Sequence, residues 1–231
     1  MKIMSFNTQH CQNFITKKID FEIMAKTIEN SGADVIGLNE MRNEGVHPEY
    51  TDQVKTLAKK TGYPYYYFAK AIDVPDGGPY GNGILSKIPL ESAKTISIPD
   101  PEVKNGSRHY ETRCILKAEL EGGYTVLITH FGLNPDEQKN AVDTVIKNIS
   151  SEKCILMGDF NLRPENEIIN PIREVMTDTA DFFSEPKLSF PSDNPYCKID
   201  YIFISRDSNV INTDIPAIIA SDHRPHTAEI E

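Results

Sequence analysis

Residues 154–164 read CILMGDFNLRP, and the rest of the chain can be interpreted outward from this segment. Residues 155–157 form a short apolar run of the kind that makes a buried strand. Gly158 permits a tight backbone turn after the run, and Asp159 and Asn161 follow two positions apart. Because side chains two apart in an extended segment point to the same side, a carboxylate and an amide are expected together at the end of this strand. The simplest alternative is an Asx turn without chemistry.

The composition limits the classes of protein to which the chain can belong. It has 231 residues, of which 39% are hydrophobic and 25% are charged, values typical of a soluble globular protein with a substantial core. The net charge is −10, and the sequence contains no block of lysine and arginine. Proteins that hold nucleic acid mainly through their electric field carry such a block, so nucleic acid is a disfavoured partner.

Cysteine usage and hydropathy bear on the cellular compartment. The four cysteines, Cys11, Cys114, Cys154 and Cys197, show neither a CxxC pair nor the spacing of a zinc site. No segment has the length and apolar character of a membrane span, and no signal peptide precedes the first predicted strand. These features predict buried, reduced thiols, a cytoplasmic location and no membrane span. Nothing in the pattern indicates an obligate protein partner.

Hydrophobic periodicity predicts a chain in which many strands alternate with a few helices. Besides the strand before Asp159, strands are expected at residues 1–6, 33–38, 63–69, 81–86, 93–98, 110–120, 124–129, 198–204 and 227–230. Helices are expected at residues 18–30, 50–61, 135–149 and 165–176, and a loop at residues 72–80. No repeat, low-complexity segment or linker divides the sequence, which predicts one domain over residues 1–231.

Polar residues recur at or near the ends of these predicted strands. They are Asn7, Glu40, Asn82, His130, Asp159, Asn161, Asp200, Asp222 and His223. Taken singly, each is most simply a turn or rim residue. Taken together, oxygen ligands without thiols suit a hard cation such as Mg²⁺, and histidines can bind a phosphate or move a proton. The sequence has no GxSxG, P-loop or GxGxxG motif, so serine hydrolases, P-loop NTPases and dinucleotide-binding proteins lose support.

Seven segments, in order and across nearly the whole chain, resemble the endonuclease/exonuclease/phosphatase superfamily. They are MSFNTQ (4–9), VIGLNE (35–40), YGNGILS (80–86), ITHFGLN (128–134), MGDFN (157–161), KIDYIF (198–203) and SDHRP (221–225). The resemblance implies a DNase I-like α/β fold, a four-layer αββα sandwich in which two mainly antiparallel sheets pack face to face. Strand ends from both sheets would then meet at one edge to form the active site.

The resemblance also implies a metal ligand set and a residue that activates water. Glu40 would be the main metal ligand, with Asn7 beside it and Asp222 assisting. Asp159 would orient or deprotonate the attacking water, and Asn161 would hold that water or the phosphate. The metal implied is Mg²⁺, for which Mn²⁺ could substitute.

Five further residues acquire roles in phosphate binding from the same resemblance. His130 and His223 would contact phosphate oxygens, and Asp200 would hold the His223 imidazole in one tautomer. Asn82 matches a phosphate-contacting asparagine. Arg113 lies where many members of the superfamily keep a cation near the site.

The function that these features predict is metal-dependent hydrolysis of a phosphoester by in-line attack of water. The chain is short for the superfamily and has no tryptophan and few inserted loops, which favours a phosphodiester of a small or lipid-derived molecule. A nuclease acting on DNA or RNA is the alternative, and a non-catalytic binding scaffold is disfavoured because no residue of the set is missing. His10, Arg42, His47 and Tyr80 could line the rim of the site, although each is more simply plain surface.

Overall fold

The computed structural model describes residues 1–46, 50–75 and 77–231, and two six-stranded sheets form its centre. The first sheet has the order β11-β12-β1-β2-β4-β3. Its strands are β1 (Lys2–Asn7), β2 (Val35–Arg42), β3 (Tyr65–Val74), β4 (Gly78–Ser86), β11 (Val210–Asp214) and β12 (His226–Ile230). The second sheet has the order β5-β6-β7-β8-β10-β9. Its strands are β5 (Leu90–Ser97), β6 (Cys114–Leu120), β7 (Thr125–His130), β8 (Cys154–Asp159), β9 (Met176–Asp178) and β10 (Asp200–Ser205).

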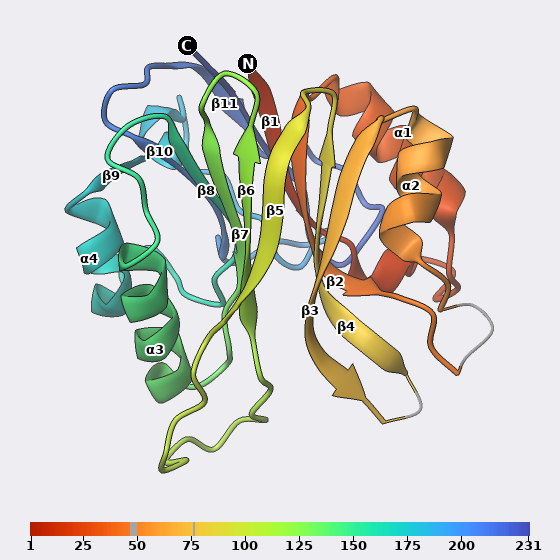
Figure 1. The fold of residues 1–231 in the computed structure, drawn as a ribbon, viewed down its shortest axis with the longest axis horizontal. Helices are drawn as coiled ribbons and strands as arrows, with labels where there is room; N and C mark the ends of the chain where they lie inside the picture. The colour runs from red at the N-terminus through yellow and green to blue at the C-terminus, as the bar shows by residue number, and fades with distance from the viewer. Residues whose placement is uncertain (47–49, 76) are drawn as a thin grey trace.

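Helices cover the outer faces of the two sheets, which gives the four layers seen in Figure 1. Helices α1 (Phe21–Ser31) and α2 (Gln53–Thr61) lie against the first sheet, and α3 (Pro135–Ile146) and α4 (Asn170–Arg173) lie against the second. Each of the first two helices begins at an aspartate cap and ends at a left-handed glycine, Gly32 or Gly62. The predicted four-layer sandwich with mainly antiparallel sheets is therefore confirmed.

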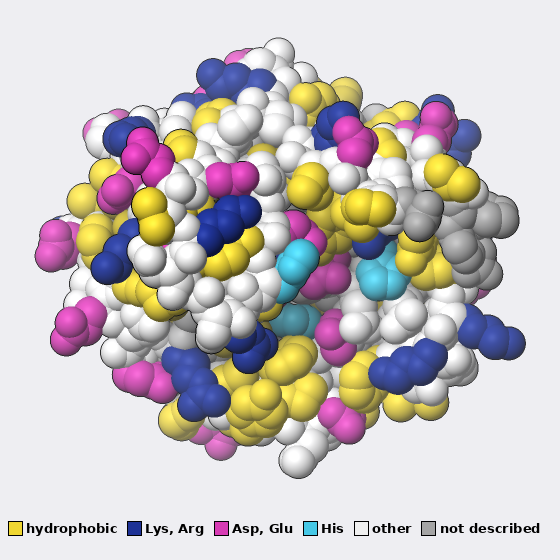
Figure 2. All heavy atoms as spheres, turned by 90° about the horizontal axis from the view of Figure 1, so that it is seen from below, with side chains coloured by type: hydrophobic (Ala, Val, Ile, Leu, Met, Phe, Trp, Pro, Cys, Tyr) yellow, Lys and Arg dark blue, Asp and Glu magenta, His cyan; other side chains and the backbone are white. Residues whose placement is uncertain are grey.

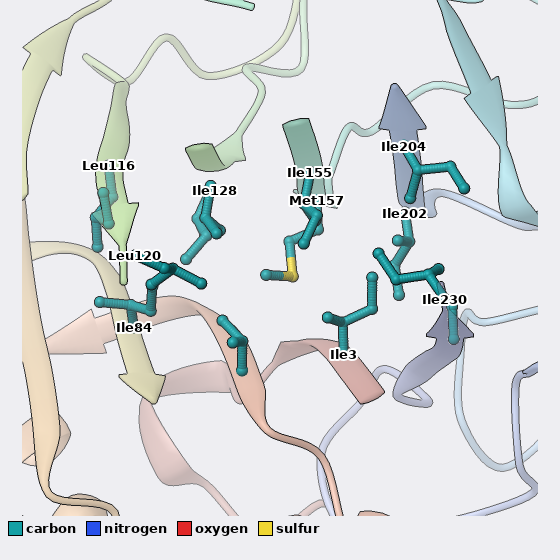
Figure 3. Packing of buried hydrophobic residues seen from close by; sticks show 14 of the residues in the cluster. Ile3, Ile84, Leu116, Leu120, Ile128, Ile155, Met157, Ile202, Ile204 and Ile230 are labelled. Atoms are coloured by element: carbon teal, nitrogen blue, oxygen red, sulfur yellow. The ribbon is translucent and has the colours of Figure 1, made fainter. Parts of the chain in front are cut away.

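Alternation along the strands divides the apolar side chains among three layers. Along β10, Ile202 and Ile204 point between the two sheets, whereas Tyr201 and Phe203 point toward the outer helices. The layer between the sheets is built from aliphatic residues and Met157 (Figure 3). This tight face-to-face packing holds the two sheets at a fixed separation, so side chains at their common edge are held in place too.

Two parallel strand pairs determine which strand ends meet. Strand β1 pairs with β2 in parallel, and β7 pairs with β8 in parallel, whereas the remaining pairs are antiparallel. The carboxyl ends of all four parallel strands therefore reach the same edge of the sandwich, opposite the two chain termini (Figure 1). Strand β10 runs antiparallel to β8 and begins at that edge, where Asp200 pairs with Asp159.

Several predicted element boundaries were wrong. The expected loop at 72–80 is mostly strand, because β3 continues to Val74 and pairs with β4 from Gly78 onward despite its Gly and Pro content. The strand expected at 110–120 begins only at Cys114, and the helix expected at 165–176 is a short 3₁₀ turn followed by the four-residue α4. The short edge strands β9 and β11 were missed. Helix α2 begins at Gln53, three residues after its predicted start.

The cysteines and the helices can be compared with the expectations about compartment. All four cysteines are buried and none forms a disulfide, as predicted. Among the described residues, no helix is long and apolar enough to cross a membrane. The cytoplasmic location stays a prediction.

Gly158 on β8 is the position where the backbone least tolerates a side chain. Its φ is +147°, and a Cβ atom would lie 1.8 Å from the carbonyl oxygen of Thr129 on β7. We expect Gly158→Ala to lower the free energy of unfolding by about 3 kcal/mol or more, since it adds a backbone clash to a strained φ. Gly122→Ala is the matched control, because Gly122 has φ +95° but open space around it. Denaturant unfolding of both variants separates the effect of the backbone clash from the effect of the positive φ. Equal losses of unfolding free energy in the two variants would contradict the clash.

Lys198 is a buried cation on the outer side of the second sheet. Its Nζ lies 3.2 Å from the centre of the Tyr201 ring and 3.6 Å from Asp178 Oδ2, yet it donates no hydrogen bond to a described residue. Burial lowers its pKa from 10.5 to about 8, although the Asp178 charge opposes the shift. The folded protein therefore binds this proton less tightly than the unfolded chain does.

This lowered pKa predicts a pH dependence of stability. Between pH 8 and 10.5 the unfolded chain holds a proton on Lys198 that the folded protein has released. The free energy of unfolding therefore rises as the pH increases through this range, and the gain is lost as the pH falls. We expect wild type to gain about 2–3 kcal/mol relative to Lys198→Met between pH 8 and pH 10. Denaturant unfolding of the two proteins at both pH values measures the difference. An equal pH dependence in both would show that Lys198 is not the group responsible.

Candidate active site

Glu40 reaches the site because strand β2 bulges where it leaves the sheet. The pairing of β2 with β4 shifts register between Leu38 and Met41, and Glu40 adopts a left-handed φ of +61°. A residue with a side chain is strained in this conformation, and such strain persists only where surrounding structure holds it. The bulge directs Glu40 toward the edge where the two sheets meet.

Asn7 connects the two sheets at this edge. Its Nδ2 donates to Glu40 Oε1 at 3.0 Å and to Asp159 Oδ2 at 3.0 Å, while its Oδ1 accepts from the Gln9 amide. The side chain of Asn7 is fully buried. Glu40, Asn7 and Asp159 are thus brought together as the sequence predicted, although they come from three strands and both sheets.

Asp159, His223 and Asp200 form a buried triad beside this group. His223 Nδ1 lies 2.8 Å from Asp200 Oδ2, and its Nε2 lies 3.6 Å from Asp159 Oδ2. Asp200 is fully buried on the inner face of β10, and its Oδ1 has no hydrogen-bond partner among the described residues. The Phe190 ring, centred 4.7 Å from the His223 ring, packs against the imidazole. The predicted pairing of Asp200 with His223 is therefore present in the structure.

Burial and charge give the members of this triad unusual protonation states. Burial raises the pKa of Asp159 to about 7, although the neighbouring His223 charge opposes the shift. Burial alone would lower the pKa of His223, but the Asp200 and Asp159 carboxylates outweigh it and raise that pKa to about 10. At neutral pH the edge therefore holds an imidazolium beside a carboxyl group that can accept a proton.

His130, at the end of β7, is held in the opposite charge state. Burial lowers its pKa well below 6.5, and the positive charges of Arg113 and His223 lower it further. Arg113 Nη1 lies 3.1 Å from His130 Nδ1 and Asn161 Nδ2 lies 3.1 Å from His130 Nε2, so N–H groups face both nitrogens of this neutral ring. Nε2 also lies 3.4 Å from Asp159 Oδ2. A neutral imidazole and a cationic imidazole thus flank the same carboxylate.

Asn161 and Asp159 are close together, but the backbone between them is not extended. Asn161 has φ +49°, and its backbone amide donates to Asp159 Oδ1 at 2.9 Å, which is an Asx turn. Its side-chain Nδ2 donates to the Phe131 carbonyl. The Asx turn is therefore part of the site, because it places the side chains of Asp159 and Asn161 together at the end of β8.

Asn39 was not among the predicted site residues, yet it joins four strands beneath the site. Its Nδ2 donates to Asn82 Oδ1 at 2.8 Å and to the Thr129 carbonyl at 2.9 Å, and its Oδ1 accepts from the Asp159 amide at 3.0 Å. Asn82 in turn donates to the Cys114 carbonyl. Both amides are buried. The sequence signal that could have identified Asn39 was its position directly before Glu40 at the end of a predicted strand. The phosphate contact expected of Asn82 stays a prediction.

The site forms a hollow in the middle of one face of the molecule. Figure 2 shows this face, with histidine and acidic side chains in the hollow and basic side chains on its walls. Arg113 is mostly buried, and its Nη1 lies 2.6 Å from Glu111 Oε1. Among the residues that could line the rim of the site, Tyr80 is buried rather than plain surface, and His10 and Arg42 are partly buried. His47 lies outside the described residues.

The donor set near Glu40 fits a hard divalent cation. Burial raises the pKa of Glu40, and the negative charge of nearby Asp222 raises it further despite a hydrogen bond from Asn7. Asp222 is itself oriented by the Ser221 hydroxyl, which donates to its Oδ1 at 3.0 Å. Two carboxylates in a shielded place, without a paired cation on Glu40 among the described residues except His10 at 3.9 Å, are chemically suited to Mg²⁺ or Mn²⁺. The predicted ligand Asn7 instead presents its N–H groups to Glu40 and uses its oxygen on the Gln9 amide, so in this arrangement it orients the carboxylate.

A second group could also hold an ion by its geometry. Asp159, Asp200 and His223 offer ligand atoms that all lie within 4.8 Å of one another. A metal there would require neutral His223, and the raised pKa of His223 opposes this. Its Nδ1 already bonds Asp200. The Glu40 side of the site is therefore the better place for a metal.

The fold is that of the DNase I-like sandwich class. The sequence profile of the Endonuclease/Exonuclease/phosphatase family matches residues 4–223, and the chain belongs to that family. The match covers every site residue described above. No curated protein sequence matches the chain.

Solved structures share the fold over the whole chain at low sequence identity. An endonuclease/exonuclease/phosphatase from Beutenbergia cavernae superposes with a TM-score of 0.83 at 20% identity, covering 100% of this chain and 71% of the other. A mannosyl-6-phosphatase from Bacteroides thetaiotaomicron gives 0.78 at 15% identity, with coverage of 100% and 99%. A humanized TDP2 from D. rerio gives 0.66 at 14% identity, with coverage of 100% and 98%. These likenesses establish the fold.

Proposed function

We propose that the chain is a divalent-metal-dependent phosphodiesterase acting on a small or lipid-derived phosphoester. The observation that carries this proposal is the placement of Asp159 between two imidazoles of different charge. A carboxylate with a pKa of about 7 is matched to accept a proton near neutral pH. The neutral His130 and the cationic His223 each place an imidazole nitrogen within 3.6 Å of it, where negative charge on a phosphate would collect.

The chain's own residues account for the proton and the charge in this reaction. Asp159 accepts the proton of the attacking water, whose oxygen forms the new bond to phosphorus. The bond from phosphorus to the leaving alcohol oxygen breaks in line, and that oxygen takes a proton from solvent. The His223 imidazolium donates to a phosphate oxygen, the neutral His130 contacts the same phosphate group, and Asp200 keeps the His223 ring in position.

Glu40 and Asp222 are the residues that would hold the metal, and Asn7 orients Glu40 through the hydrogen bond from its Nδ2. When bound, Mg²⁺ or Mn²⁺ would act as a Lewis acid that offsets the charge of the phosphate group. The raised pKa of Glu40 supports this assignment, since two close carboxylates without a cation repel each other. Asn7 also positions the Asp159 side chain, because its Nδ2 donates a hydrogen bond to Asp159 Oδ2.

The net charge favours a small substrate over nucleic acid. Binding to DNA weakens with salt in proportion to the number of phosphates that the protein neutralises. A chain with a net charge of −10 and no basic block should neutralise few of them. We therefore expect weak DNA binding with a shallow dependence on salt concentration.

A panel of substrates at low and moderate salt tests the proposal. We expect hydrolysis of bis-p-nitrophenyl phosphate and of glycerophosphodiesters in the presence of Mg²⁺, and little cutting of plasmid DNA at moderate salt. Efficient cutting of duplex DNA with the small diesters untouched would replace this proposal by the nuclease alternative. Binding of the diesters without any turnover would instead support a scaffold.

A further inference from the structure

Arg42, at the end of β2, carries a guanidinium group in which two of the three nitrogens make no hydrogen bond to a described residue. Its Cζ lies 4.5 Å from the centre of the Tyr80 ring and 5.1 Å from that of the Tyr50 ring. Its Nε and Nη1 are buried and make no hydrogen bond, and within the described part of the chain no carboxylate lies within ion-pair distance. Aromatic rings interact with the faces of a guanidinium, so its N–H groups stay available for an acceptor.

The unused N–H groups require an explanation, because buried polar groups in folded proteins are almost always paired. Leaving a buried charged donor without an acceptor destabilises a protein by more than a neutral one does. The neighbouring Arg113 also has an Nε with no partner among the described residues, but its charge is paired with the Glu111 carboxylate. Arg42 has no such partner in the described structure, and an anion supplied by a ligand would provide one.

Arg42 lies beside the metal side of the active site. His10 Nδ1 is 3.9 Å from Glu40 Oε2, and the charge of Arg42 helps burial to lower the pKa of that same His10 to about 4. Arg42 and Tyr80 are cross-strand partners on β2 and β4. Arg42 therefore lies near His10, which in turn lies next to Glu40.

The surroundings of Arg42 are held rigidly. Gln53, fully buried at the start of α2, accepts from the Arg42 amide through Oε1 at 2.9 Å and donates through Nε2 to the His10 carbonyl at 2.8 Å. The loop that carries His10 has left-handed φ angles of +47°, +47° and +63° at Gln9, His10 and Cys11. Strain of this kind at three successive residues is typical of functional sites that are held in place before the ligand binds.

We propose that Arg42 binds a second phosphate group of the substrate, next to the phosphate that is cleaved. Arginine is the side chain best suited to this task, since its planar N–H groups match the spacing of phosphate oxygens. This inference rests on the phosphodiesterase function proposed above and narrows the substrate to a small diester that carries an additional phosphate. Arg42 is then a residue that determines specificity.

A pair of chromogenic diesters that differ by one phosphate tests the inference. We would compare thymidine 5′-(p-nitrophenyl phosphate) with the same diester carrying a 3′-phosphate, and measure kcat/KM for each with Mg²⁺. Wild type is expected to prefer the 3′-phosphorylated diester by about tenfold or more, the effect of one charge-assisted contact. Arg42→Gln should abolish the preference, and Arg42→Lys should restore part of it, because charge is kept but the planar geometry is lost.

The matched control is Lys59→Gln, which removes one positive charge from the exposed surface of α2 and should keep the full preference. No preference in wild type, or an equal loss for both diesters in Arg42→Gln, would overturn the inference. An effect of Arg42→Gln on a single-stranded oligonucleotide with none on the small pair would also overturn it, in favour of a polymer substrate.

A binding measurement separates this inference from the proposed function. Calorimetry with thymidine 3′,5′-bisphosphate requires no turnover, and wild type is expected to bind it about tenfold more tightly than Arg42→Gln. If neither diester is hydrolysed but this difference is found, the phosphodiesterase proposal fails and the phosphate site stands. If the diesters are hydrolysed and this difference is absent, the phosphate site fails alone.

Discussion

Asp159→Asn is expected to lower kcat by two to four orders of magnitude on any phosphodiester that the enzyme hydrolyses, the range ~10²–10⁴ typical for loss of a positioned acid or base. The substitution keeps the size and burial of the side chain and removes its negative charge and its capacity to accept a proton, and it also loses the hydrogen bond that Oδ2 accepts from Asn7. The hydrogen bond from the Asn161 amide to Oδ1 can form with either residue, so the Asx turn should survive. Circular dichroism and denaturant unfolding check that the fold is intact.

The control is Asp143→Asn, the same chemical change on the exposed face of α3, which should leave kcat unchanged. A residual rate within tenfold of wild type for Asp159→Asn would show that another group accepts the proton. His223→Ala is expected to lose a comparable factor, since it removes the cation beside Asp159. The double variant should lose much less than the product of the two factors, because two residues that serve one step are not additive. Multiplicative losses would show that they serve separate steps.

The inner and outer faces of the strands could be predicted from the sequence because strand side chains alternate. Asp200 follows this rule, lying opposite Tyr201 and Phe203 and sharing the inner face with Ile202 and Ile204. A charge on that face needs a partner, and the structure supplies His223 at 2.8 Å. Local pattern and elementary electrostatics were sufficient here.

Contacts between the two sheets could not be predicted in the same way. Asn39 reaches Thr129 and the Asp159 amide only because the core sets how far apart the sheets lie, and no local pattern encodes that distance. The bulge at Glu40 is similar, since its register shift depends on how β4 pairs with β2. The short edge strands β9 and β11 were missed because three to five residues carry too little periodicity to be recognised.

Glu40→Gln is expected to abolish measurable turnover at Mg²⁺ concentrations that saturate wild type, because a neutral amide replaces the principal carboxylate ligand of a hard cation. Excess EDTA should have the same effect on wild type. Metal binding can be measured without turnover: at 100 times its dissociation constant, a bound ion raises the free energy of unfolding by about 2.7 kcal/mol. We expect Mg²⁺ to stabilise wild type by an amount of this order and to stabilise Glu40→Gln much less.

Without a metal, the difference in stability between wild type and Glu40→Gln should have the opposite sign. Burial and the Asp222 charge raise the pKa of Glu40, so its carboxylate is repelled in the absence of an ion. Glu40→Gln removes that repulsion and should therefore be at least as stable as wild type in EDTA, so that lost activity cannot be attributed to unfolding. Glu29→Gln, on the exposed face of α1, should alter neither activity nor the response to Mg²⁺. Full turnover of wild type in excess EDTA, or equal stabilisation of wild type and Glu40→Gln by Mg²⁺, would show that Glu40 holds no metal.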